Sequence, residues 1–440
     1  MRHTGRLSRK SLRLILLLIG AALVALVSLG FARMADAALE WNRRWTSAHG
    51  WLAFIVLPLG LLALRWLTLR FAPYAGGSGI PQVIGALSLP PGRPQWRLVS
   101  MQTAWKVPLT FLGMLMGASV GREGPSVQVG AAVMLAWSRL CVRLGVPLRG
   151  LDLRELIAAG AAGGLAAAFN APLAGVVFAI EELGRGIALR WQRRVLIAVL
   201  TAGFLVVAVA GNNPYFGHFG GAAFAHGMLA WTLLCCLVNG VLGGVFARLL
   251  EKGLAGSLPE ALGAAVRRHP YWLAAGMGLL MACLGMLTAG AVYGTGYAAA
   301  AGMLAGEPAP VAGFGLAKLI ATVASYWAGI PGGIFTPALT TGAGIGHQIW
   351  HWAGAGVDQR VLVLLSMAAF LAAATQAPLT ASVVVMEMTG SQPMLFWLLA
   401  ASLGASVVSR QFSPQPFYHL MAGRFRRQTL AAEAFASKPA

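Results

Sequence analysis

Gly121-Arg122-Glu123-Gly124-Pro125 is a charged pentapeptide inside a stretch of sequence that is otherwise apolar. Apolar residues fill most of Val107–Met116 before it and of Ala131–Trp137 after it. An ionisable side chain at the centre of a membrane segment costs roughly 3 kcal/mol or more, so it is usually retained for function. The surrounding glycines and proline predict an interrupted helix, which is tolerated at membrane depth only beside protein or a cavity. The pentapeptide therefore indicates a site that a polar substrate reaches within the membrane.

The composition identifies the class of protein. Hydrophobic residues make up 58% of the 440 residues and charged residues 10%, far from the usage of soluble domains. About 20 apolar residues span a bilayer, and we predict spans at Leu14–Phe31, Trp51–Leu64, Met101–Gly121, Leu156–Ile180, Val195–Ala210, Met228–Leu250, Trp272–Val292, Val361–Met386 and Leu395–Val408. We therefore predict a multi-pass membrane protein in which residues 1–440 form a single transmembrane domain, with tails at 1–13 and 421–440.

The net charge of +20 does not indicate nucleic-acid binding. The basic residues cluster at the ends of the predicted spans, near residues 2–13, 139–154, 190–194, 267–268 and 424–427. Such flanks are typical of cytoplasmic loops, which carry an excess of lysine and arginine. We therefore expect both termini to be cytoplasmic and expect no nucleic-acid partner.

The chain contains an internal repeat. The segment Asn170-Ala-Pro-Leu-Ala-Gly-Val-Val-Phe-Ala-Ile-Glu-Glu182 returns 206 residues later as Gln376-Ala-Pro-Leu-Thr-Ala-Ser-Val-Val-Val-Met-Glu-Met388. Upstream of each copy, the pattern of Gly121, Pro125 and Gly130 returns 212 residues later at Gly333, Pro337 and Gly342. Two halves on one plan, approximately 40–210 and 225–420, are typical of transporters whose broken helices meet at the substrate site. The residues alone leave open whether the repeat is inverted or parallel.

Three glycine–proline motifs predict broken helices, at 77–81, 121–125 and 333–337. A helix N-terminus presents free N–H groups and a partial positive charge, so it binds anions without a full cation. Several N-termini at one point favour a small anion that is held weakly enough to leave. Close helix packing at glycine is the alternative explanation for any single motif.

These motifs resemble those of the CLC family of chloride channels and chloride/proton exchangers. Gly-Ser-Gly-Ile-Pro, Gly-Arg-Glu-Gly-Pro and Gly-x-Phe-x-Pro follow in the family order, with the segment before Glu182, the Tyr293–Tyr297 turn and Pro416-Phe-Tyr418. The resemblance implies an all-α protein with an inverted repeat, broken helices that meet near the bilayer midplane, and one anion pathway in each subunit of a homodimer. It also implies a bacterial inner-membrane protein that is not an enzyme and has no cofactor, with chloride and protons as the transported species.

The resemblance assigns roles to individual residues. The hydroxyls of Ser78 and Tyr418 and the backbone N–H groups of Ile334 and Phe335 are expected to bind a central chloride. Glu123 corresponds to the gating glutamate, and Glu182 corresponds to the internal proton acceptor of the exchangers. Supporting positions are Gly79, Pro81, Lys106, Arg122, Gly124 and Glu181.

Two positions, Lys106 and Ser78, distinguish this sequence from some members of the family. In bacterial relatives, an acidic residue shortly after the Gly-Ser-Gly-Ile-Pro motif can pair with the lysine that corresponds to Lys106. In this chain the residues at those positions are Gln82 and Ile84, neither of which is acidic. The sequence therefore leaves the partner of Lys106 open. Ser78 favours chloride over fluoride and nitrate, because members that prefer those anions carry other residues there.

Two rival functions remain. A passive, gated chloride channel would share the fold and the anion site, and Glu182 favours exchange over it because an ionisable group there is expected to carry a proton. An intramembrane metalloenzyme is suggested by His347 and His351, which lie one helical turn apart as in zinc proteases. The glutamate that such a site needs as general base is replaced by Gln348, so we expect no metal there.

Overall fold

The computed structural model describes residues 2–90, 96–145, 152–185, 193–219, 227–354 and 357–436, and within them the chain is helical. The helices are α1 (Arg2–Ala48), η1 (Gly50–Leu52), α2 (Ala53–Phe71), α3 (Ile80–Leu87), α4 (Trp96–Met116), α5 (Glu123–Arg143), α6 (Leu153–Phe169), α7 (Pro172–Phe178), η2 (Ala179–Leu183), α8 (Arg193–Ala210), α9 (Met228–Ser257), α10 (Glu260–Arg268), α11 (Pro270–Leu287), α12 (Tyr297–Leu304), α13 (Phe314–Trp327), α14 (Phe335–Ala353), α15 (Gln359–Thr375), α16 (Pro378–Thr389), η3 (Gln392–Met394), α17 (Leu395–Ser409) and α18 (Phe417–Ala436).

The hydropathy of these helices is that of a multi-pass membrane protein. In the part of the chain that the structure describes, six segments are long and apolar enough to cross a bilayer: Ser11–Ala48, Gly50–Phe71, Glu123–Arg143, Met228–Ser257, Pro270–Leu287 and Gln392–Ser409. Shorter apolar helices cover Val195–Ala210, Gln359–Thr375 and Pro378–Thr389. The predicted tails contain helix, because α1 begins at Arg2 and α18 reaches Ala436. Residues 1, 91–95, 146–151, 186–192, 220–226, 355–356 and 437–440 of the predicted domain lie outside the described residues.

Two of the predicted spans are each divided into two helices. Asn170 separates α6 from α7 and Gln376 separates α15 from α16, and both residues have the left-handed backbone conformation, with φ of 53° and 60°. Each caps the helix before it with its own N–H, and proline at the first or second position of the next helix prevents continuation of the first. Apolar runs alone therefore overestimate the lengths of these helices.

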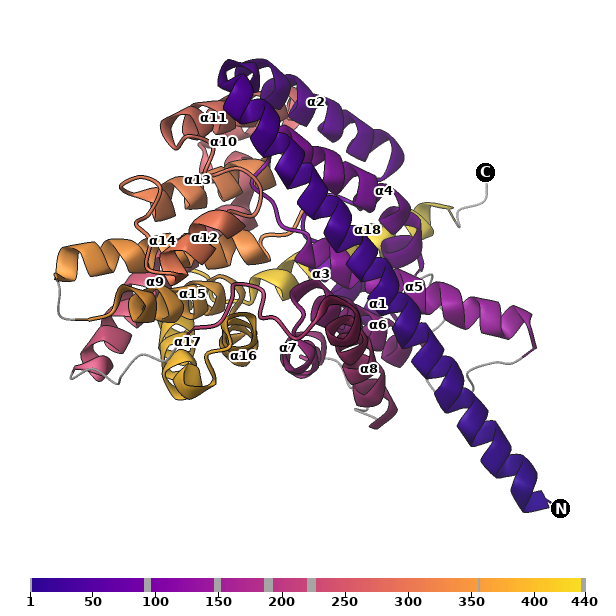
Figure 1. Cartoon of the computed structure of the whole chain (residues 1–440). Helices are drawn as coiled ribbons and strands as arrows, with labels where there is room; N and C mark the ends of the chain where they lie inside the picture. Colours follow the sequence, from indigo (N-terminus) through magenta and orange to yellow (C-terminus); the bar gives the residue numbers. More distant parts are fainter. Residues whose placement is uncertain are drawn as a thin grey trace.

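The two halves of the repeat form two groups of helices that meet along a seam. Figure 1 shows α1–α8 on one side of the molecule and α9–α17 on the other, with α7 and α16 adjacent between them. The last helix, α18, crosses the seam and packs against α3 of the first half. The seam is therefore where residues from both halves can build one site.

Glycine allows the closest helix crossings in each half. A Cβ on Gly130 of α5 would collide with the carbonyl oxygen of Gly160 in α6, and a Cβ on Gly342 of α14 would collide with that of Ser366 in α15. Because Gly130 and Gly342 are repeat-related, the two crossings are versions of one contact. The glycine spacing that recurs in the two halves of the sequence is therefore explained by helix packing as well as by the chain breaks.

Candidate functional site

The broken helices are joined at their first glycines. The N–H of Gly121 donates to the carbonyl of Gly333 at 2.7 Å, and the N–H of Gly333 donates back at 2.7 Å. Beside this antiparallel bridge, Gly77 forms a parallel bridge with Pro331, in which Gly77 donates to Ile330 O at 3.0 Å and accepts from Gly332 N at 3.1 Å. The three motifs predicted to break helices therefore lie together.

The helices that start there are α3, α5 and α14. Gly79, with φ of 108°, precedes α3, and Pro81 occupies the first turn of that helix. A Cβ on Gly79 would lie 2.7 Å from Gly124 O, and a Cβ on Gly124 would collide with Ser78. Glycine at both positions is thus what allows the starts of α3 and α5 to touch.

The chloride ligands predicted from the resemblance lie in this buried region. Ser78 and Tyr418 are 2% and 1% exposed, and Ile334 and Phe335 begin α14 and are equally buried. Tyr418 lies near Ser78, Glu123 and Glu182, yet neither hydroxyl has a hydrogen bond of ordinary geometry among the described residues. Two buried hydroxyls at helix N-termini are suited to donate to a small anion.

Glu123 lies at the start of α5 and is fully buried. Its carboxylate faces the Thr336 hydroxyl and the backbone N–H groups of Thr336 and of Glu123 itself, although none of these contacts has full hydrogen-bond geometry. The carboxylate is thus at the N-terminus of α14, where an anion would also be stabilised. The competition between Glu123 and chloride stays a prediction.

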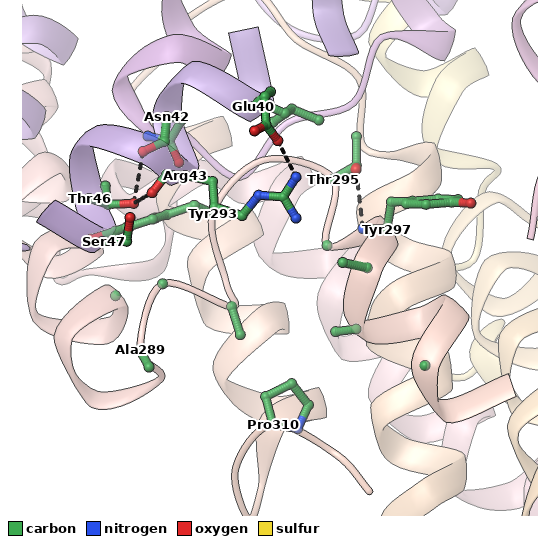
Figure 2. A pocket seen from close by; sticks show the side chains of 18 of the residues that line it. Glu40, Asn42, Arg43, Thr46, Ser47, Ala289, Tyr293, Thr295, Tyr297 and Pro310 are labelled. Carbon is green, nitrogen blue, oxygen red and sulfur yellow. Dashed lines mark hydrogen bonds and ion pairs between the residues drawn. The ribbon is translucent and has the colours of Figure 1, made fainter. Parts of the chain in front are cut away.

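Arg122 connects this region to a cavity of about 1290 Å³. Its guanidinium donates to Ala32 O, forms a 2.6 Å ion pair with Asp36 of α1, and lies over the ring of Tyr215. Figure 2 shows other lining residues, with Glu40 and Arg43 joined by an ion pair and Tyr297 beside Thr295. Arg122 lines this cavity, whereas Glu123, the next residue in the chain, does not line it and is fully buried.

Glu182 also lies near Tyr418, in η2, a π-helical turn that ends α7. Its side chain is 1% exposed, and neither carboxylate oxygen accepts a hydrogen bond from the described residues. The wider π turn directs adjacent residues differently from an α turn and is common at functional sites. Here it leaves Glu182 buried while Glu181 points elsewhere.

Glu181 caps a helix in the other half of the molecule. Its carboxylate accepts hydrogen bonds from the N–H groups of Leu379 at 3.1 Å and Thr380 at 2.6 Å, in the first turn of α16. Glu387, which lies 206 residues after Glu181, accepts from Leu173 at 3.1 Å and Ala174 at 2.6 Å in the first turn of α7. Each glutamate thus caps a helix in the opposite half of the molecule, across the seam. The repeat interval of 206 residues could have predicted this role for Glu387.

The structure supplies the partner of Lys106. Its Nζ donates to Gln128 Oε1 of α5 at 2.9 Å, and the amide of Gln128 donates in turn to Leu98 O. Gln82, which stands where relatives can carry an acidic partner, donates instead to Tyr74 O and Gly76 O. A neutral amide oxygen therefore replaces a carboxylate.

A second buried lysine was not identified from the sequence. Lys318 of α13 donates from Nζ to Val292 O at 2.8 Å and Gly294 O at 2.7 Å, in the turn that leads to Tyr297. It lies 212 residues after Lys106, the same interval that separates Gly121 from Gly333. The interval is the sequence signal that could have identified it.

One histidine of the pair has a backbone partner. His347 Nε2 accepts a hydrogen bond from the N–H of Ala309 at 3.1 Å, and the neighbouring Gln348 Oε1 accepts from Gly313 N at 3.2 Å. The lone pair of His347 Nε2 is thus engaged by the backbone, while His351 is exposed.

The comparisons with known proteins agree with these features. The family model described as voltage gated chloride channel matches residues 59–410. The chain is 31% identical to the H(+)/Cl(−) exchange transporter ClcA of Yersinia pseudotuberculosis, over 94% of this chain and 84% of the relative. It is also 31% identical to ClcA of Vibrio cholerae, over 84% of this chain and 78% of the relative.

Solved structures show the same fold. A slow cyanobacterial Cl−/H+ antiporter matches with a TM-score of 0.76 at 24% identity, over 94% of this chain and 98% of the other. A CLC-type fluoride/proton antiporter matches with a TM-score of 0.71 at 21% identity, over 93% and 98%. The expected all-α, CLC-type fold is confirmed, and the chain belongs to the CLC family of voltage-gated chloride channels and their transporter relatives.

Proposed function

We propose that this protein exchanges chloride for protons across the membrane, through a pathway in each subunit of a homodimer. The observation that carries the proposal is a cluster of buried polar groups in which Tyr418 lies near both Glu123 and Glu182. Both carboxylates are almost completely buried. Buried carboxylates without a close cationic partner are costly and mark ion or proton pathways in membrane proteins.

The anion branch uses neutral donors. Ser78 and Tyr418 offer hydroxyls, and the N–H groups at the start of α14 offer partial positive charge. Such a site holds chloride weakly enough for release. The Glu123 carboxylate competes for the same donors, and protonation removes its charge so that chloride can take its place.

The proton branch uses Glu182. It lies near Tyr418, which in turn lies near Glu123. The sequence relatives named as H(+)/Cl(−) exchange transporters support this assignment over a passive channel. Chloride and protons are then the transported species, and the proposal requires no cofactor.

The partner surface lies on α8 and α17, as the apolar runs Val195–Ala208 and Leu395–Val408 predict. Phe204, Leu403 and Val407 are exposed large apolar side chains on these helices. A second copy is the proposed occupant, held by close packing and lipid release. The basic residues Arg424, Arg426 and Arg427 on α18 are exposed, so we place this end and the N-terminus on the cytoplasmic side of a bacterial inner membrane.

The test is proton uptake into liposomes under an imposed chloride gradient, with chloride efflux recorded in parallel. Wild type should drive protons uphill. Glu123→Gln should move chloride without protons, because the amide neither competes as an anion nor takes a proton. Glu182→Gln should lose uphill proton movement while chloride still binds. Glu260→Gln, an exposed change on α10, is the control and should behave as wild type.

Wild type that moves chloride without any proton signal would contradict the proposal, because the protein would then be a channel. Proton pumping that survives Glu182→Gln would keep the exchanger but place the internal acceptor elsewhere, with Glu181 as the first candidate. A metal-dependent activity that a chelator removes would revive the metalloenzyme alternative.

A further inference from the structure

His419 is a titratable side chain beside Glu182. It follows Tyr418 on α18, and its side chain is 21% exposed, whereas that of Glu182 is 1% exposed. The imidazole therefore reaches both the solution and the buried carboxylate. The Pro416-Phe-Tyr418 motif ends one residue before His419, so the sequence did not identify His419 as a candidate.

The hydrogen bond of His419 defines its tautomer. Nε2 lies 2.9 Å from the carbonyl oxygen of Glu182, and because a carbonyl oxygen only accepts, Nε2 carries the hydrogen. Nδ1 is then the basic nitrogen that can take a second proton. The same Nε2 lies 3.6 Å from Glu182 Oε1, so a small rotation brings its proton into hydrogen-bond range of the carboxylate.

The other ionisable groups around His419 and Glu182 make different contacts. Glu181 is bound to the first turn of α16. Arg185, which lies near both His419 and Glu182, donates to Gln376 O at 3.1 Å. Tyr418 lies near Glu182. Burial and the nearby Arg185 guanidinium lower the pKa of His419 from its usual value, so the neutral imidazole is the resting form and the imidazolium is a transient carrier. His419 is thus the contact of Glu182 whose imidazole can take up and release a proton.

We propose that His419 relays protons between the solution at the α18 face and Glu182. The inference rests on the proposed role of Glu182 as internal proton acceptor. Water delivers a proton to Nδ1 and forms an imidazolium. The Nε2–H bond then breaks as an O–H bond forms at Glu182 Oε1, which leaves a neutral imidazole with its hydrogen on Nδ1 and a neutral carboxylic acid. Uptake of a proton from water at Nε2 forms the imidazolium again, and loss of the Nδ1 proton to water then restores the starting tautomer; the reverse sequence releases a proton.

The position of α18 fits this direction of transfer. Downstream of His419 the helix carries the exposed residues Arg424, Arg426 and Arg427, which mark the cytoplasmic side under the positive-inside rule. The relay would therefore serve cytoplasmic protons, while the cavity at Arg122 serves the opposite side.

The test separates a relay from a structural contact. In His419→Gln, the amide Nε2 can still donate to Glu182 O but does not titrate, and in His419→Ala both properties are lost. We expect proton uptake under a chloride gradient to fall at least about tenfold in both variants, since a positioned acid–base group contributes about 10²–10⁴-fold. Chloride affinity by calorimetry should stay at the wild-type value. Imidazole in the buffer should partly restore proton uptake in His419→Ala, and His269→Gln, an exposed change, should have no effect.

The outcomes distinguish this inference from the proposed function. Normal proton uptake in His419→Gln, with loss in Glu182→Gln, would overturn the relay and keep the exchanger. Loss in His419→Ala with normal uptake in His419→Gln would show that only the hydrogen bond to Glu182 matters, and would also overturn the relay. Wild type without any proton movement would overturn both.

Discussion

We expect Glu181→Gln and Glu387→Gln to destabilise the protein by the same amount. Each carboxylate accepts two backbone hydrogen bonds of the same lengths, 3.1 and 2.6 Å, from the first turn of a helix in the other half. A hydrogen bond to a charged group contributes about 1.5–3 kcal/mol. Glutamine keeps one neutral acceptor and turns an NH2 group toward the second N–H. Because both side chains are partly exposed, we take the lower end and expect a loss of about 2 kcal/mol each.

The measurement is equilibrium unfolding in mixed detergent micelles, followed by tryptophan fluorescence. Glu260→Gln is the matched control, since its exposed side chain should change the free energy of unfolding by less than about 0.5 kcal/mol. The double variant should lose about 4 kcal/mol, because the two caps share no hydrogen-bonding group. A loss confined to one variant, or a loss as small as that of the control in both, would refute the exchange of caps between the halves.

Three further outcomes are expected. Ser78→Pro removes a hydroxyl and a backbone N–H beside the anion site, so the ratio of chloride to nitrate flux should fall; an unchanged ratio would mean that Ser78 does not line the site. Trp at both Leu403 and Val407 should give a monomer by size-exclusion chromatography that still moves chloride, whereas a folded but inactive monomer would contradict one pathway per subunit. Lys318→Met removes the donor to two buried carbonyls, whereas Lys106→Met removes the donor to one amide oxygen. The free energy of unfolding should therefore fall further in Lys318→Met than in Lys106→Met, by about 1–3 kcal/mol. The reverse order would contradict these contacts.

The sequence predicted the broken helices because their causes are local. Gly77 and Gly79 allow the positive φ of the first break, and glycine at Gly121 and Gly333 allows the two backbones to approach closely. Proline in the first turn of the following helix needs no N–H partner. The repeat intervals then indicated two halves with a shared site. The structure places Ser78, Glu123 and Tyr418 around the meeting point of α3, α5 and α14. Their roles in transport stay predictions.

The boundaries of some helices required the structure. The apolar runs Leu156–Ile180 and Val361–Met386 were predicted as single spans, but Asn170 and Gln376 each end one helix and precede another. Hydropathy does not record a change of backbone direction between two apolar helices. The Ala-Pro dipeptide in both copies of the repeat was the available signal.

The sequence by itself determined the class of protein, the family, the helix starts and the residues that carry ionisable groups, because each depends on composition or on a few adjacent residues. The tertiary structure decided which groups meet. Lys106 binds Gln128 across α4 and α5, Glu181 caps α16, and His419 contacts Glu182 over 237 positions of sequence. These pairings depend on how whole helices are rotated and crossed, and many side chains far apart in the chain together determine that packing.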